Sequence, residues 1–187
     1  MLDDRLAPFV DSFIETGRDI FLSGLISSHG GNLSVRAGEL IVITRRGSML
    51  GRLKAADLVV TGMEPCADDE ACSRELVVHR EIYRRTDARA VVHAHPVHAV
   101  ARSMRADAIV PVDSEGSYVV GEVPVVQASE TIGSAEAAAL LGEALQERPV
   151  AVLRSHGAFA KGATLEEAFY HVSVLEASAR ILDLIGR

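Results

Sequence analysis

The sequence predicts an α/β protein in which a mixed or largely antiparallel sheet carries helices on both faces. Segments with helical periodicity alternate with short apolar segments, and one pair of apolar segments is joined by a turn too short for a helical crossover. The chain has 187 residues, of which 48% are hydrophobic and 24% charged, and shows no repeat, low-complexity tract or linker. We therefore expect residues 1–187 to form a single domain.

The first part of the chain reads as a helix followed by a hairpin and a third strand. Apolar residues recur every three or four positions over residues 3–25, which predicts an amphipathic helix that ends at the paired glycines of SSHGGN. LSVR and LIVIT then predict a β-hairpin, with Gly38 in the bend. The loop RRGSMLGRL, a short strand at 58–61 and an irregular acidic stretch, EPCADDEA, follow.

The middle of the chain predicts a helix, a strand and a second helix. A Ser side chain accepts amide hydrogens of a first helical turn, so Ser73 is expected to cap the helix SRELVVHREIYRRT and to place Glu75 in that turn. Residues 88–95 follow as a strand. Pro96 then opens a short helix that runs through Ala101.

The last part of the chain predicts further strands and two longer helices. Strands are expected at 109–112 and 123–127, separated by DSEGSYVVGE. ETIGSAEAAALLGEALQERP is an Ala- and Leu-rich helix that ends at Pro149, and VAVLR is a buried strand that runs into SHGAFAKG. In the final helix, Thr164 and Glu167 have the spacing of a capping box.

Charge and composition exclude several classes of protein. Nineteen Lys and Arg against 26 Asp and Glu give a net charge of -7, which would repel nucleic acid and anionic membrane surfaces. No uninterrupted apolar stretch approaches a membrane span, and the segment MLDDRLAPFV does not resemble a signal peptide. Cys66 and Cys72 are too few for a disulfide framework. We expect a cytoplasmic protein without a nucleic acid or membrane partner.

The segment VVHAHPVHAV places imidazoles in an apolar strand. His93 and His95 stand two positions apart, so both rings would point to the same side of the sheet. A catalytic zinc ion takes three protein ligands and keeps one open position, and His156, before Gly157 at a strand end, is the best candidate for a third ligand. The alternative is that each is a hydrogen-bonded core residue. The other histidines are expected to be structural or exposed (His79, His98, His171) or intermediate (His29).

Other residues have both a chemical and a structural interpretation. Gly30 and Gly31 would expose amide hydrogens as an anion cradle does, although a plain turn is the favoured interpretation. Residues 45–48 (RRGS) could grip a phosphate or form a solvated basic loop. Glu75 is either a general base near a metal or a complement to the helix dipole, and the local sequence does not choose between these.

Taken in order, short motifs along nearly the whole chain resemble the class II aldolase and adducin head-domain family, nearest in outline to its fuculose-1-phosphate aldolase type. These motifs are GGNLSVR at 30–36, ITRRG at 43–47, SRE at 73–75, HAHP at 93–96, and SHG at 155–157 followed by the LEEAF helix. Each motif is short, but their order and spacing together are specific.

The resemblance implies a three-layer α/β/α sandwich with a mostly antiparallel central sheet, assembled as a homotetramer with active sites at subunit contacts. It implies that a divalent cation, usually zinc with Mn²⁺ or Co²⁺ as alternatives, is held by His93, His95 and His156. Glu75 matches the family's acid and base carboxylate. The residues that match its phosphate-binding positions are Gly31, Asn32, Arg46, Gly47, Ser73 and Arg74.

The activity implied is cleavage of a small ketose 1-phosphate to dihydroxyacetone phosphate and a short aldehyde. The cation would act as a Lewis acid toward an enediolate, and Glu75 would move the proton on its carbon. A pentulose-phosphate 4-epimerase and a ribulose-phosphate-type dehydratase are alternatives within the family. A non-catalytic module such as the adducin head is an alternative from another class, but it would lack the histidines and Glu75.

The sequence departs from the family at the anion site and near one tyrosine. Arg45, Arg46 and Arg74 stand where relatives often have Pro, Ser or Thr, so the anion could also be a carboxylate. A tyrosine that assists the fuculose-type enzymes falls near Glu115 here, with Tyr118 close by. The group that protonates the aldehyde oxygen is therefore unassigned.

Overall fold

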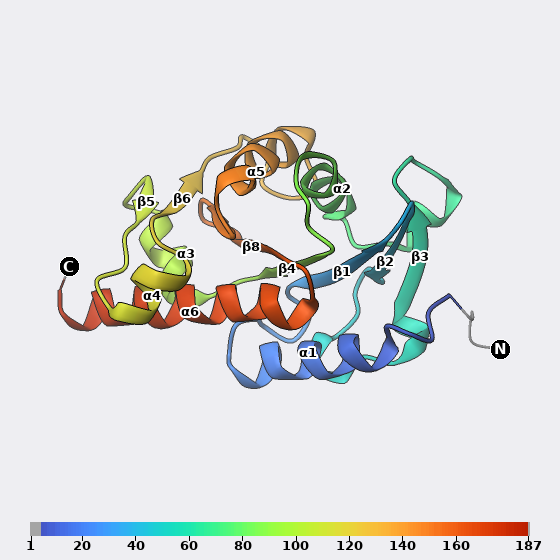
Figure 1. The fold of residues 1–187 in the computed structure, drawn as a ribbon, viewed down its shortest axis with the longest axis horizontal. Coiled ribbons are helices and arrows are strands. Elements are labelled where there is room, and N and C mark those ends of the chain that lie inside the picture. Colours follow the sequence, from blue (N-terminus) through green and yellow to red (C-terminus); the bar gives the residue numbers. More distant parts are fainter. Residues whose placement is uncertain (1–4, 187) are drawn as a thin grey trace.

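The computed structural model describes residues 5–186, which form one eight-stranded sheet between two layers of helices (Figure 1). The strand order is β3-β2-β1-β4-β8-β7-β6-β5. The β6–β7 pair is parallel and the other pairs are antiparallel. The strands are β1 Asn32–Ala37, β2 Leu40–Thr44, β3 Leu58–Gly62, β4 Ala90–Ala94, β5 Ala108–Ile109, β6 Val123–Val126, β7 Val150–Leu153 and β8 Gly157–Gly162.

The helices cover both faces of this sheet, which confirms the three-layer α/β/α sandwich. One face carries α1 Val10–Leu22, α3 Val97–Ser103, α4 Ser114–Val119 and α6 Leu165–Leu184. The other face carries α2 Leu76–Arg85 and α5 Ala135–Glu147, which pack against each other (Figure 1). Three short 3-10 helices lie in loops: η1 Leu50–Arg52, η2 Ala55–Asp57 and η3 Ala67–Ala71.

The central strands bury both of their faces and divide the core in two. Along β4, Val92 packs in the core beneath α1 and α6, whereas Val91 packs in the core beneath α2 and α5. Phe159 of β8 also lies on the α2 and α5 side. Because side chains alternate along a strand, His93 shares the side of Val91 and Phe159. The strand pattern thus directs this imidazole toward α2 and α5.

The hairpin, the strand at 58–61 and the helix after Pro96 are confirmed, but the first helix is shorter than residues 3–25. It begins at Val10, and residues 5–9 form turns, while positions 3 and 4 lie outside the described residues. Proline disfavours the helical conformation at the residue before it, so Pro8 stops the helix from extending toward the N-terminus. At the other end the helix stops at Leu22, and Gly24 has a positive φ of 72°.

Two elements, α4 and β8, were not expected from the sequence, and the strand expected at 109–112 is reduced to β5. Asp113 caps α4 by accepting a hydrogen bond from the Gly116 amide at 2.8 Å. The six residues of β8 are Gly, Ala, Phe and Lys, of which only Phe159 favours strands. Pairing with β4 on one side and β7 on the other makes this weak segment a central strand.

The capping predictions are only partly confirmed. Helix α2 begins at Leu76, so Ser73 is not its N-cap, and the Ser73 hydroxyl instead accepts from the Glu75 amide at 3.3 Å. The Ser73 amide donates to the Thr44 carbonyl, which ties this residue to the end of β2, so the helix begins after it. Before α6, Thr164 caps the Glu167 amide as expected. The Glu167 carboxylate, however, accepts from Ala163 rather than closing the box.

A buried arginine fixes the segment that leads into α2. Arg80 is 6% exposed, and its guanidinium donates to both carboxylate oxygens of Asp69, at 2.7 and 2.8 Å. The hydrogen bond from Arg80 lowers the pKa of Asp69 to about 2.

The two cysteines are free, as expected. Among residues 5–186, none of the helices combines the length and the apolar character that crossing a membrane would require.

Candidate metal centre and its cavity

The candidate site lies at one end of the sheet, where five strand ends meet. Because β1 runs antiparallel to β2 and β4, the start of β1 lies beside the ends of β2 and β4. The β7–β8 turn reaches the same end, since Ala94 pairs with Ala158. Residues 29–32, 45–48, 73–75, 93–95 and 156 therefore converge although they are far apart in sequence.

His93 and His95 come from the end of β4, and His156 comes from the turn that joins β7 to β8. Ser155, which precedes His156, has a φ of 62° and is the one non-glycine residue with a positive φ among residues 5–186. Such a conformation costs an L-residue on the order of 1 kcal/mol, and it turns the chain sharply before β8. At Gly157 a Cβ atom would lie 2.4 Å from the Ala94 carbonyl oxygen, so only glycine fits between the turn and β4.

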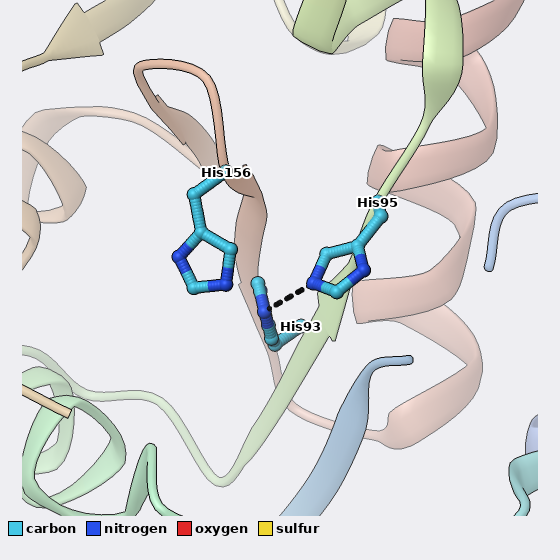
Figure 2. A group of neighbouring side chains, drawn as sticks. All are labelled: His93, His95 and His156. Carbon is cyan, nitrogen blue, oxygen red and sulfur yellow. Dashed lines mark hydrogen bonds between the residues drawn. The ribbon is translucent and has the colours of Figure 1, made fainter. Parts of the chain in front are cut away.

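The three imidazoles face one another (Figure 2). One potential ligand atom from each lies within 4.8 Å of the others, and the Nε2 atoms of His93 and His95 are 3.0 Å apart. Nδ1 of His93 donates to the Ala158 carbonyl at 3.0 Å, which leaves its Nε2 lone pair toward the group. Phe159 stacks on the His93 ring, with centroids 4.0 Å apart and planes at 15°. The His93 ring is thus held on its face and at its rear nitrogen.

All three rings are uncharged at neutral pH. Burial, followed by the neighbouring His95 and His156 rings, holds the pKa of His93 well below its usual range. Burial lowers the pKa of His95 to about 4 and also lowers the pKa of His156. Uncharged imidazole is the form that binds metals, because a protonated ring nitrogen has no free lone pair.

This donor set suits a divalent cation. Three neutral imidazoles with one side open to a cavity are the ligands of a catalytic zinc site, and the hydrogen bond from His93 to a carbonyl is a typical outer-shell support. A single proton can bridge the Nε2 atoms of His93 and His95, and a cation bound by both lone pairs would take that proton's place. Nδ1 of His156 is buried without a hydrogen-bond partner.

A buried carboxyl group, that of Glu75, lines the same cavity. It is 4% exposed, and burial raises the pKa of Glu75 to about 7, although the Gly133 amide donates to Oε1 at 3.2 Å and opposes this shift. The other oxygen, Oε2, is buried without a partner. A carboxyl group poised near neutral pH can both accept and return a proton. A residue that only complements the dipole of α2 would not need to be buried in this way.

Every residue singled out by the sequence as a ligand, acid-base or anion-binding group lines one cavity of about 330 Å³. The positions are Gly31, Asn32, Arg46, Gly47, Ser73, Arg74, Glu75, His93, His95 and His156. The rest of the lining comes from His29, Gly30, Arg45, Ser48 and Ile132. The structure thus brings together segments that the sequence identifies only as separate candidates.

The cavity is locally positive in a chain that is negative overall. Arg45, Arg46 and Arg74 are exposed at its wall, and Glu75 supplies its single carboxyl group. Gly31 has a φ of 77°, and a Cβ atom there would lie 2.7 Å from the His93 carbonyl oxygen, so glycine is required for the chain to pass β4 this closely. Arginines and closely approaching backbone amides are suited to a small anion.

Sequence reasoning missed the loop before α5. Ile132 lines the cavity and the Gly133 amide holds Glu75, but the sequence predicts that both residues belong to the helix that ends at Pro149. The signal for a loop in the sequence is a glycine directly before a serine that can cap a helix. In the structure Gly133 has a φ of 62° and Ser134 is the N-cap of α5. Neither Glu115 nor Tyr118 lines the cavity, and Tyr118 is 92% exposed.

The remaining histidines lie outside the imidazole group, as expected. His98 contacts Asp183 at 2.6 Å, and His171 donates to the Lys161 carbonyl at 3.0 Å. His29 is exposed at the mouth of the cavity. His79 is completely buried, with its ring nitrogens bonded to Ser34 and to Asn32.

Comparison with known proteins adds a family match over most of the chain. Residues 11–182 match the sequence profile described as Class II Aldolase and Adducin N-terminal domain. A solved structure, that of L-fuculose-1-phosphate aldolase from Thermus thermophilus, is 42% identical. It superposes with a TM-score of 0.93 over 96% of this chain and 95% of that one.

Curated relatives with two different activities match at the same level of identity. An L-fuculose phosphate aldolase from Methanococcus maripaludis is 30% identical over 170 residues, which cover 90% of this chain and 93% of the relative. A methylthioribulose-1-phosphate dehydratase from Acidiphilium cryptum is also 30% identical, over 188 residues, covering 92% and 89%. The names of these relatives share a phosphorylated sugar but differ in the reaction.

Replacing His95 with Ala is expected to abolish tight metal binding. Loss of an outer-shell partner costs about 10 to 100-fold in affinity, so loss of a ligand is expected to cost at least about 100-fold. Zinc content after dialysis, measured by plasma emission spectroscopy, checks this. The matched control is His98→Ala, which removes a half-exposed imidazole outside the cavity and should leave the zinc content unchanged. Equal zinc in His95→Ala and the wild type would contradict the site.

Replacing Glu75 with Gln is expected to stabilise the metal-free protein as the pH rises. The folded-state pKa of about 7 lies above the ordinary value of 4.5, so the carboxyl group favours folding below pH 4.5 and loses that contribution as the pH rises through 7. Urea unfolding in chelator from pH 4 to 8 should show the variant gaining stability over the wild type across this window. A difference that is constant with pH would contradict the burial-driven shift.

Proposed function

The chain belongs to the class II aldolase and adducin N-terminal domain family, and on that premise we propose that it is a metal-dependent aldolase acting on a small ketose 1-phosphate resembling fuculose 1-phosphate. The products would be dihydroxyacetone phosphate and a short aldehyde. The observation that carries this proposal is the cavity in which three neutral imidazoles, a carboxyl group with a pKa near 7 and arginines meet. An adducin-like binding module would have no need for such a set.

The proposed ligands are His93, His95 and His156, with zinc as the expected ion and Mn²⁺ or Co²⁺ as alternatives. When bound, a divalent cation would supply a Lewis acid that draws electron density from the substrate's carbonyl and adjacent hydroxyl oxygens. The protein's own contribution is to hold the rings uncharged and aligned. Burial keeps the rings uncharged. The Ala158 carbonyl and the Phe159 ring keep the His93 ring aligned.

Glu75 is the proposed acid and base. In the cleavage direction the bond between C3 and C4 breaks, the C4 hydroxyl gives its proton to solvent as the aldehyde forms, and the electron pair remains on C3 next to the carbonyl. Glu75 in its protonated form would deliver a proton to C3, and in the reverse direction its carboxylate would remove that proton. A pKa of about 7 populates both forms at neutral pH.

The proposed phosphate site is formed by the polar residues of the cavity other than the imidazoles and Glu75. Its side-chain donors come from Asn32, Arg46, Ser73 and Arg74, and Gly31 and Gly47 keep the backbone accessible. A guanidinium matches two oxygens of a phosphate group at once, which favours a phosphorylated substrate over a neutral sugar. The phosphorylated substrates named for the relatives support this assignment.

Dehydration of a substituted ribulose 1-phosphate is the second candidate. The dehydratase from Acidiphilium cryptum is as similar to this chain as the archaeal aldolase is. Both reactions need a proton moved on a carbon next to the carbonyl, which the same carboxyl group can do. They differ in the bond that breaks, carbon–carbon or carbon–oxygen, and a pentulose-phosphate 4-epimerase would remake the carbon–carbon bond.

We further propose a cytoplasmic homotetramer with active sites at subunit contacts. Large apolar side chains are exposed near the ends of α3 and α6, and a second cavity of about 710 Å³ lies between these elements. The exposed apolar side chains include Met104 at 58%, Val110 at 54% and Leu184 at 77% exposure. Exposed apolar groups gathered in this way are typical of protein interfaces.

The metal-loaded protein is expected to release dihydroxyacetone phosphate from L-fuculose 1-phosphate or ribulose 1-phosphate, measured with a coupled reductase. Glu75→Gln should lower kcat by at least about 100-fold while zinc content is kept, because a general acid or base contributes about 10² to 10⁴-fold. Release of water without a free aldehyde would favour the dehydratase. An inverted C4 centre with no net cleavage would favour the epimerase.

In solution the chain is expected to have four times the monomer mass of 20.0 kDa. Light scattering coupled to size exclusion measures this directly. Met104→Glu together with Val110→Glu should shift the protein toward smaller species, because charges would replace apolar contacts at the proposed interface. A monomeric wild type at micromolar concentration would exclude this assembly.

A further inference from the structure

A chain of buried hydrogen bonds runs from the interior of α2 to the floor of the cavity. Tyr83 Oη lies 2.7 Å from Ser34 Oγ, which lies 2.6 Å from Nδ1 of His79. Nε2 of His79 lies 2.6 Å from Oδ1 of Asn32. The exposed fractions are 1% for Tyr83, 0% for Ser34 and His79, and 6% for Asn32. Asn32 is the only one of the four that lines the cavity.

Secondary structure sets the spacing of this chain. Asn32 and Ser34 are two positions apart on β1 and therefore point to the same side of the sheet, toward α2. His79 and Tyr83 are four positions apart on α2 and therefore lie on one face of the helix. Ser34 thus contacts both His79 and Tyr83, and Asn32 contacts His79. The packing of α2 on the sheet therefore holds these four side chains in place.

The hydrogens along the chain can be assigned. Oδ1 of Asn32 can only accept, so Nε2 of His79 carries the hydrogen. Burial lowers the pKa of His79 to about 3, so the ring is neutral and its Nδ1 must accept from the Ser34 hydroxyl. That hydroxyl has used its single hydrogen, so its oxygen accepts from Tyr83. The bonds run in one direction, from the phenol to the amide oxygen.

The contact between His79 and Oδ1 of Asn32 shows which end of the amide is left for the cavity. Its oxygen is committed to His79 on the α2 side, so the group that it can present to a ligand is the amide nitrogen with two hydrogens. A primary amide turned the other way would offer an oxygen, which would repel an anion. Asn32 also pairs with His93 across β1 and β4, so its donor stands beside the metal centre.

We propose that His79 is a positioning residue, which holds the Asn32 side chain with its amide hydrogens toward the cavity so that they bind the anionic group of the substrate. The inference rests on the proposed function for the anion-binding role of Asn32. It adds a residue that does not touch the cavity and therefore acts only through Asn32. Ser34 supports it by donating to Nδ1, which selects the ring tautomer.

The test is the affinity of the zinc-loaded protein for inorganic phosphate, followed by ³¹P NMR titration. His79→Phe keeps a buried ring but removes the donor to Asn32, and is expected to raise Kd about tenfold. The matched control is Tyr83→Phe, which removes a hydroxyl from the far end of the same buried chain and leaves the bond from His79 to Asn32 intact. Its Kd should stay within about twofold of the wild type. Equal losses in both variants would mean a general distortion of the core and would overturn the proposal.

A double-mutant cycle separates this inference from the function on which it rests. Asn32→Ala should weaken phosphate binding, and adding His79→Phe to it should cause no further loss, because His79 has nothing left to position. If Asn32→Ala binds phosphate normally, the anion-binding role of Asn32 fails and the inference fails with it. If Asn32→Ala weakens binding but His79→Phe does not, only the inference fails.

A measurement on the unmodified protein keeps the proposal testable if a variant does not fold. The ¹⁵N chemical shifts of the His79 ring at neutral pH should report a hydrogen on Nε2 and none on Nδ1. Ser34→Ala, a smaller change, removes the donor to Nδ1 and should weaken phosphate binding severalfold. A ring with its hydrogen on Nδ1 in the wild type would overturn the assignment.

Discussion

The antiparallel pairing of β4 with β8 is the contact on which the site depends. It brings Ala158 beside Ala94 and thereby sets the turn that carries His156 against the end of β4. The same pairing provides the carbonyl that fixes one imidazole and the phenyl ring that supports its face. Because strands pair through backbone groups, a register shift of one residue would turn these side chains to the opposite face. The geometry of the candidate metal centre is therefore a property of the sheet.

The sequence predicts the chemical groups of the site more accurately than it predicts the helices and strands around them. Two histidines two positions apart on a strand must share a side, and a histidine at the end of another strand is a natural partner, so the imidazole group could be predicted. Its convergence with residues 45–48 and 73–75 could not be derived from spacing alone, because it requires the strand order. That step came from the resemblance of short motifs to a known family.

The elements that were missed have physical reasons. Strand β8 consists mostly of Gly and Ala, which have little intrinsic preference for strands, and it forms because it fills the position between β4 and β7. Helix α4 is six residues long with Gly116 inside it, so periodicity could not identify it. The expected cap at Ser73 does not form because a backbone bond to Thr44 ties that residue to the end of β2. In each case tertiary contacts outweighed local preference.

The separation of the ligands along the chain has a consequence for folding. His93 and its backbone partner Ala158 are 65 positions apart, so the pocket for the ion does not exist until a distant strand has been added to the sheet. Contacts between residues so far apart in sequence form late, because closing a long loop carries an entropic cost before any contact compensates for it. During synthesis, a nascent chain that has emerged only just past β4 carries two of the three imidazole ligands. Binding of the proposed ion would therefore follow assembly of the sheet.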